Sequence, residues 1–326
     1  MWIPLKWQMK LKLYKKNNRM KRRDFLKNTA ASSTLLGLGS LPLSSFESAT
    51  ALEVKKITIL HTNDVHSHID PFPVNHPKNP GQGGVARRAA VIEQIRKTEE
   101  HVLLLDAGDI FQGTPYFNYY GGELEFKLMS MMKYDLATIG NHDFDNGVEG
   151  LLAQLPHAKF DFVSANYDFR NTVLDTHVKP YKTFKKGGIK IGVFGIGVEL
   201  KGLVDKKLYK ETVYNDPIDI SSHFAKKLKE DEKCDIVICL SHLGFEYKND
   251  PEKVCDRMLA QKTQNIDLII GGHTHTFLDK PIVEKNSAGQ DVVINQVGAY
   301  GINLGRIDFY FDNKMNLSST GRKIIL

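Results

Sequence analysis

The sequence has few cysteines and no long apolar run after its first fifty residues, and each of these two shortages excludes a class of protein. Its 326 residues include three cysteines, Cys234, Cys239 and Cys255. None of them has C-x-x-C spacing, which excludes a cysteine-based zinc or dithiol redox site. Both tryptophans, Trp2 and Trp7, lie close to the N-terminus. After the first fifty residues no apolar run is long enough to cross a bilayer, so we expect no membrane span in the mature chain.

Excess positive charge is confined to the N-terminal leader, residues 1–51. The leader carries ten Lys or Arg against two acidic residues, a net charge of +8, whereas the whole chain is +6, so residues 52–326 sum to −2. The basic pI therefore belongs to the leader, and we expect no nucleic-acid polymer as a partner.

The leader resembles a twin-arginine export signal. In "KRRDFLKNTAASSTLLGLGSLPLSS", the pair Arg22 and Arg23 precedes an apolar stretch that is too short to span a bilayer. Small residues follow, and we expect cleavage after Ala51, with Met20 as an alternative true start. These features predict export by the twin-arginine translocation machinery to the periplasm or another extracytoplasmic space. Residues 52–326 are then expected to form a single domain.

The remaining chain alternates β-rich runs with amphipathic helical patterns, which predicts a layered α/β fold. We see no internal repeat and no low-complexity linker. Residues 70–84, "DPFPVNHPKNPGQGG", are expected to form a loop whose length favours a functional role. Strands are predicted at 55–63, 101–108, 135–140, 160–166, 189–197, 234–242, 266–273, 291–298 and 305–312, and helices at 84–97, 122–133, 147–155, 217–230 and 251–262.

Polar side chains follow five of the predicted strands, each at the point where the strand ends. In open α/β sheets ligands bind outside the carboxyl ends of the strands, so these residues predict one convergent site. Their oxygen and nitrogen donors suit Mn, Fe or Zn. They are too many for one catalytic metal, so we expect two divalent ions. The residues are Asp64, His66, Asp109, Asn141, His142, His242, His273 and His275.

The ordered motifs "LHTNDVHSH", "DAGDIFQGTPYF", "YDLATIGNHDFDNG" and "GGHTHT" resemble the calcineurin-like metallophosphoesterases. Within them, they look like the catalytic domain of the 5'-nucleotidase and UDP-sugar hydrolase group. This resemblance implies a four-layer αββα sandwich over residues 52–326. It also implies that Asp64, His66 and His275 bind the first metal, that Asn141, His242 and His273 bind the second, and that Asp109 bridges them.

The resemblance implies hydrolysis of small-molecule phosphoesters by a hydroxide shared between the two ions. Nucleotides are the substrates that we expect before any other phosphoester. His142 and Asp145 resemble the family's catalytic dyad, in which the carboxylate orients and charges the ring. Asn166, in "SAN", is expected to touch the substrate. Asp143, where many relatives have Glu, is expected to have no role beyond supporting the ligands from behind or supporting the turn.

The chain departs from the nucleotidases in one respect. Those proteins usually carry a C-terminal domain that clamps the base, and we expect it to be absent here, because the sequence ends at Leu326. Three alternatives to a free-standing nucleotidase therefore stay open. A separately encoded chain could supply the substrate-binding domain, the enzyme could be sulfate thiohydrolase-like, or the chain could be a non-catalytic metal-binding module.

Overall fold

The structure, a computed structural model, describes residues 54–313 and 315–326. The leader, with its predicted export signal, its cleavage site and the alternative start at Met20, lies outside the described residues. Within Leu52–Leu326 the chain forms one compact unit. No helix in the described part of the chain has the length and apolarity needed to cross a membrane.

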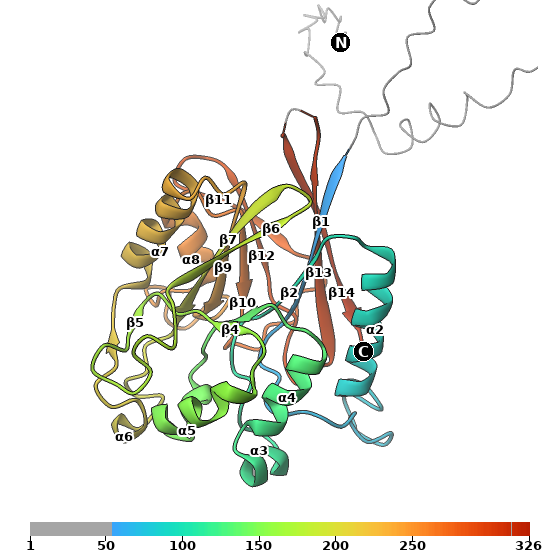
Figure 1. Ribbon diagram of the computed structural model, residues 1–326, viewed down its shortest axis with the longest axis vertical. Coiled ribbons are helices and arrows are strands. Elements are labelled where there is room, and N and C mark those ends of the chain that lie inside the picture. Colours follow the sequence, from blue (N-terminus) through green and yellow to red (C-terminus); the bar gives the residue numbers. More distant parts are fainter. Residues whose placement is uncertain (1–53, 314) are drawn as a thin grey trace, which may run out of the picture. The chain divides into compact units, whose positions relative to one another are not determined.

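Two six-stranded sheets form the centre of this unit (Figure 1). The first has the order β14-β13-β1-β2-β3-β4, and β1 to β4 run parallel. The second has the order β11-β12-β10-β9-β7-β6, and β7, β9, β10 and β12 run parallel. The strands of the first sheet are β1 Lys55–Thr62, β2 Val102–Asp106, β3 Leu136–Ala137, β4 Asp161–Phe162, β13 Asn303–Phe311 and β14 Leu317–Ile325. Those of the second are β6 Tyr181–Lys186, β7 Ile189–Gly197, β9 Ile236–His242, β10 Leu268–Gly271, β11 Ile282–Lys285 and β12 Asp291–Asn295. A small ribbon pairs β5 Tyr167–Asp168 with β8 Val213–Tyr214.

Helices cover the outer face of each sheet (Figure 1). α2, α4 and α5 pack on the first sheet, and α7 and α8 pack on the second. α7 begins at Pro217, because the Asp216 side chain caps it by accepting from the backbone N–H groups of Ile218 and Asp219 at 2.8 and 2.9 Å. The helices are α2 Val85–Thr98, α3 Pro115–Tyr120, α4 Glu123–Met131, α5 Gly147–Gln154, α6 Lys206–Tyr209, α7 Pro217–Lys226 and α8 Asp256–Lys262, with a π-turn at Lys227–Asp231 and 3-10 turns at His142–Phe144 and Leu155–His157.

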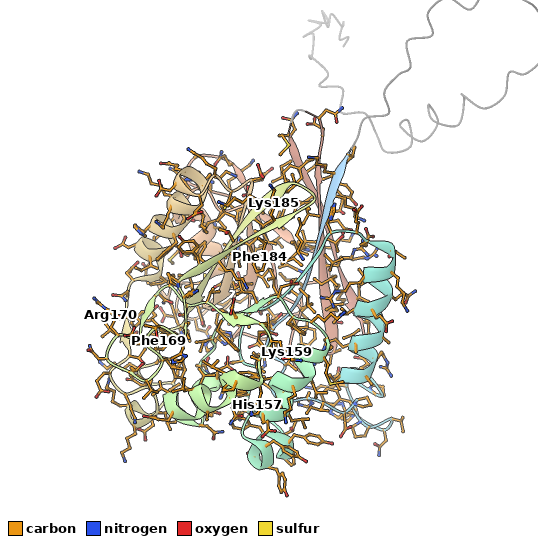
Figure 2. All side chains as sticks on the ribbon, viewed as in Figure 1. His157, Lys159, Phe169, Arg170, Phe184 and Lys185 are labelled. Atoms are coloured by element: carbon orange, nitrogen blue, oxygen red, sulfur yellow. The ribbon has the colours of Figure 1, made fainter. Side chains whose placement is uncertain are left out.

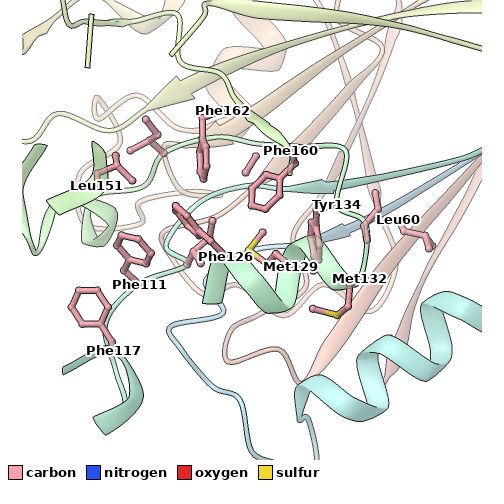
Figure 3. Packing of buried hydrophobic residues seen from close by; sticks show 14 of the residues in the cluster. Leu60, Phe111, Phe117, Phe126, Met129, Met132, Tyr134, Leu151, Phe160 and Phe162 are labelled. Atoms are coloured by element: carbon pink, nitrogen blue, oxygen red, sulfur yellow. The ribbon is translucent and has the colours of Figure 1, made fainter. Parts of the chain in front are cut away.

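Three apolar clusters fill the spaces between the layers. In β2, Leu103 and Leu105 point between the sheets, whereas Leu104 points toward the helices. The outer cluster of the first sheet is rich in aromatic rings, among them Phe126 of α4 packed on Phe162 of β4 (Figure 3). Helix, sheet, sheet and helix therefore follow one another, which confirms the predicted four-layer αββα sandwich.

The predicted elements are all found, with different bounds in places. The strands predicted at 135–140 and 160–166 shorten to two residues each, and the helix predicted at 251–262 begins only at Asp256, since Cys255 is extended. Strand β6 was not predicted because its sequence is rich in lysine. It is an edge strand in which Phe184 packs on the core between the sheets while Lys185 is exposed (Figure 2).

Candidate metal centre

The predicted site residues meet where the parallel strands of both sheets end. Asp64 and His66 follow β1, Asp109 follows β2, Asn141 follows β3, His242 ends β9, and His273 and His275 follow β10. The loops pack closely. A Cβ at Gly140 would lie 2.2 Å from Asp109 Oδ1, so only glycine lets the loops after β2 and β3 approach this way.

Five of the seven predicted ligands have a left-handed backbone. Their φ angles are 50° for Asp64, 49° for His66, 56° for Asp109, 71° for His273 and 52° for His275. Residues with a Cβ rarely adopt this conformation because the Cβ crowds the backbone. Such strain persists only where the surrounding structure enforces it, and it concentrates at functional sites.

The ligand atoms fall into two clusters, within each of which they all lie within 4.8 Å of one another. In the first, His275 Nε2 lies 3.5 Å from Asp64 Oδ1 and 3.0 Å from His66 Nε2. In the second, which joins Asp109, His242 and His273, His242 Nε2 lies 3.0 Å from Asp109 Oδ2.

Asn141 and Asp109 complete the arrangement. Asn141 Oδ1 lies 2.7 Å from His273 Nδ1, which adds the amide to the second cluster. Asp109 Oδ2 lies 3.7 Å from His66 Nε2 as well as 3.0 Å from His242 Nε2, so one carboxylate oxygen faces both clusters. This is the geometry that a bridging ligand requires.

Backbone carbonyls orient two of the imidazoles for metal binding. His66 Nδ1 lies 3.1 Å from the carbonyl oxygen of Phe111, and His242 Nδ1 lies 2.7 Å from that of Ala107. A ring whose Nδ1–H donates to a carbonyl presents the lone pair of Nε2 on its other side. His242 Nε2 is fully buried, and its nearest polar neighbour is Asp109 Oδ2 at 3.0 Å, so the ring directs this nitrogen at the carboxylate that faces both clusters.

The electrostatics of the clusters also suit cations. Burial raises the pKa of Asp64 to about 8 and lowers that of His66 to about 4, so that ring is neutral near pH 7. Burial opposes the protonation of His242, but the carboxylates of Asp109 and Asp64 outweigh it and raise the pKa to about 10. A buried carboxylate needs a partner positive charge, which a divalent ion would supply in place of the proton. The donor set therefore fits two divalent ions.

His142 and Asp145 lie beside the clusters. His142 Nδ1 is 3.0 Å from Asp145 Oδ2, and its backbone N–H donates to Asp109 Oδ1 at 2.8 Å. The His142 side chain is 37% exposed, and its ring centroid is 5.3 Å from that of His66. The hydrogen bond that the His142 ring donates to the Asp145 carboxylate raises the pKa of His142. The ring is thus held close to the clusters, accessible and biased toward its cationic form.

Asn166 has a different environment from the one expected. Its side chain is completely buried, its Nδ2 donates to the carbonyl of Gly197 at 2.8 Å, and its Oδ1 accepts from the Gly197 N–H at 2.8 Å. These bonds link the β4–β5 segment to the end of β7. They argue for a structural role of Asn166 instead of the expected contact with substrate.

Two residues support the site from behind the ligands. Asp143, for which we expected no role beyond such support, accepts four backbone N–H bonds, from Asp109, Ile110, Phe111 and Gly140, at 2.8 to 3.1 Å. No local pattern marks three of these donors, which lie more than thirty residues earlier in the chain.

Asn63 supports the first cluster in a similar way. Its Nδ2 donates to Asp64 Oδ2 at 2.6 Å and to the carbonyl of Gly298 at 2.6 Å, and its Oδ1 accepts from the Val297 N–H at 3.1 Å. The only signal in the sequence was its position directly before a predicted ligand.

The fold and the paired clusters define the class as the metal-dependent phosphoesterases. Residues 57–277 match the model of the calcineurin-like phosphoesterase family. The chain belongs to this family.

Its relatives narrow the similarity further. The chain is 36% identical over 293 residues to the snake venom 5'-nucleotidase of Crotalus adamanteus, a match that covers 83% of this chain and 48% of the relative. The chain therefore spans about half the length of the curated relatives it matches. Among solved structures, the 5'-nucleotidase precursor from Thermus thermophilus has a TM-score of 0.75 at 30% identity, covering 83% of this chain and 55% of that one. The sulfate thiohydrolase of Thermus thermophilus has a TM-score of 0.68 at 18% identity, covering 82% and 56%, a likeness of fold alone.

Proposed function

We propose that this chain hydrolyses phosphomonoesters of the nucleotide class, using two divalent ions held by the two clusters. The observation that carries the proposal is the position of Asp109, whose Oδ2 faces both clusters and whose Oδ1 holds the backbone of His142. Bound in these clusters, two ions would lower the pKa of water and neutralise phosphoryl charge. The names of the relatives, 5'-nucleotidases in venom and in Thermus thermophilus, support the nucleotide class.

The residues of the chain would do the rest of the chemistry. His66 and His242 keep their Nε2 lone pairs directed inward because their Nδ1–H groups donate to carbonyls. His142, charged with the help of Asp145, can screen a phosphoryl oxygen and give a proton to the leaving alkoxide. Because its backbone is bonded to Asp109, the ring keeps a fixed position relative to both clusters.

The test is phosphate release by the full-length chain loaded with Mn, Zn or Fe. The substrates are nucleoside 5'-monophosphates, cyclic nucleotides, UDP-sugars and an aryl phosphate. We expect turnover of nucleoside monophosphates, and a fall in kcat of about 10²- to 10⁴-fold in His142→Ala. His157→Ala is the matched control, since His157 lies on the 3-10 turn Leu155–His157 and joins neither cluster (Figure 2). Absence of phosphate release from every ester would contradict the proposal.

The same metal-loaded chain, tested also with a sulfur-containing substrate and for bound metal, separates the remaining alternatives. Turnover restricted to the aryl phosphate would favour a separately encoded substrate-binding chain. Release of sulfate from a cysteine-bound thiosulfate derivative, with no phosphate release, would favour the sulfate thiohydrolase. Metal binding without turnover of any substrate would favour the non-catalytic metal-binding module.

We further propose that the chain acts outside the cytoplasm, after export by the twin-arginine translocation machinery. The support is the order of paired arginines, short apolar stretch and small residues in the leader. A relative named as a venom protein is consistent with this setting.

A further inference from the structure

A cavity of about 520 Å³ lies directly beside the metal clusters. His66, His142 and His275 form part of its lining, and the loop 70–84 provides another part, through Phe72 and His76. Its volume lies in the range of sites that enclose small organic ligands. A molecule bound at the clusters would therefore extend along this loop.

The loop 70–84 has an ordered backbone that its own hydrogen bonds stabilise. The N–H of Phe72 donates to the carbonyl of Gln82 at 2.8 Å, and the N–H of His76 donates to that of Pro73 at 2.9 Å. At the end of the loop, a Cβ on Gly84 would lie 3.0 Å from the backbone nitrogen of Pro71, so the two ends of the loop pack tightly. The loop therefore has a defined backbone conformation beside the cavity.

A row of rings runs from the clusters along the cavity. The Tyr300 ring centroid lies 5.5 Å from that of His275 and 4.7 Å from that of His68. His68 stacks on Phe72 at 5.0 Å and 25°, and Phe72 lies 4.6 Å from His76. Tyr300 is more than two hundred residues from the members on the loop, so only the fold assembles the row.

Packing of these rings on one another covers only part of their surface. His68, Phe72, His76 and Tyr300 are all half-buried, and all four line the cavity. Rings that face an open cavity leave π surface available for a planar ligand, and aromatic groups prefer offset or edge-on contact with such a surface. The row therefore suits a ligand with an aromatic ring of its own.

Polar groups beside the row of rings favour a heterocyclic ligand, which can form hydrogen bonds, rather than a hydrocarbon ring. His76 Nδ1 accepts from the N–H of Asn79 at 3.0 Å, which leaves Nε2–H as a donor. Gln112, exposed on the loop after β2, also lines the cavity, and its side chain makes no hydrogen bond to any described residue. Its amide can both donate to and accept from the edge of a base.

We propose that Phe72, His76 and Tyr300 form a base-binding platform on the catalytic domain itself. The ligand is a nucleoside 5'-monophosphate whose phosphate lies at the clusters and whose base stacks on the row. This inference rests on the proposed function and adds a specificity site to it. It assigns the loop 70–84 the task of distinguishing a nucleotide from a phosphoester without a base.

The test compares two substrates of the metal-loaded, full-length chain. Adenosine 5'-monophosphate carries a base, whereas ribose 5-phosphate presents the same phosphate without one. Phe72→Ala should lower kcat/KM for the nucleotide by about tenfold, since loss of one stacking ring weakens base binding by about 5- to 150-fold. It should leave kcat/KM for ribose 5-phosphate unchanged. Phe72→Tyr should restore the preference.

Val74→Ala is the matched control, because Val74 belongs to the same loop, is 88% exposed and does not line the cavity. Val74→Ala should leave kcat/KM unchanged for both substrates. If Phe72→Ala lowers kcat/KM equally for both substrates, or for neither, the platform is overturned while the proposed function stands. Absence of turnover of both substrates by the unaltered chain would instead contradict the proposed function.

A binding measurement tests the platform even if the unaltered chain turns over neither substrate. Saturation-transfer NMR with adenosine should show magnetisation passing from the protein to the base protons in the unaltered chain and in Val74→Ala. The transfer should vanish in a Phe72→Ala, His76→Ala double variant. Equal transfer in all three proteins, or none in any, would overturn the platform.

Discussion

Asp143 offers the sharpest test of how the site is held together. Its carboxylate is 1% exposed and accepts two N–H bonds on each oxygen. Burial, together with the neighbouring Asp109, raises its pKa to about 6, so it is ionised at pH 7. Asp143→Ala leaves four buried N–H groups without an acceptor. At about 1 kcal/mol for each group, the free energy of unfolding should fall by about 4 kcal/mol.

Urea denaturation followed by circular dichroism, with the chain stripped of metal, measures this change directly. Asp143→Glu is the control, because it keeps the carboxylate and adds one methylene, a change that costs about 1–3 kcal/mol in a packed interior. Asp143→Ala should be the less stable of the two. A loss below about 1 kcal/mol in Asp143→Ala, the net worth of a single hydrogen bond, would refute the reasoning that these bonds join the loops after β2 and β3.

Three further predictions follow from the dyad, the core and the leader. Asp145→Asn should move the alkaline limb of the pH–rate profile to lower pH, because the hydrogen bond that raises the pKa of His142 is lost; an unmoved limb would exclude a cationic His142. Burial lowers the pKa of His61 to about 3, below the 6.5 of the unfolded chain, so the unfolded chain binds the extra proton and stability should fall by about 1.4 kcal/mol per pH unit from 6.5 downward. Urea midpoints from pH 7 to 5 should fall less steeply in His61→Asn, and parallel curves would count against this assignment. Changing both Arg22 and Arg23 to Lys should retain the protein in the cytoplasm, and cell fractionation that finds it still exported would rule out the twin-arginine route.

The sequence was sufficient for the parts of the fold that have strong local patterns. β2, β7 and β9 are largely apolar runs that are almost entirely buried, and β1 is buried from Ile57 onward; sequence patterns identify such runs well. Because polar residues follow such runs directly, the positions of the ligands could be inferred from the rule that parallel strands end at one edge. The geometry of the two clusters agrees with that inference, although the assignment of ligands to ions stays a prediction.

The features that sequence reasoning missed depend on contacts between distant segments. Asp143 serves backbone groups of the preceding loop, and Asn166 serves Gly197, so neither role has a local signature. The ring of Tyr300 joins that of His68 only after β13 pairs with β1 and brings the two segments together. Local pattern also missed β6, because lysine at a sheet edge looks like a solvated loop.

Metal content of the full-length chain, measured by inductively coupled plasma mass spectrometry after loading with Mn, Zn or Fe and removal of free ions, tests the two-ion site most directly. We expect two ions per chain, one for each cluster. We expect no more than one ion in Asp109→Ala, because the carboxylate that faces both clusters is lost. One ion or none in the unaltered chain, or two in Asp109→Ala, would contradict a two-ion site bridged by Asp109.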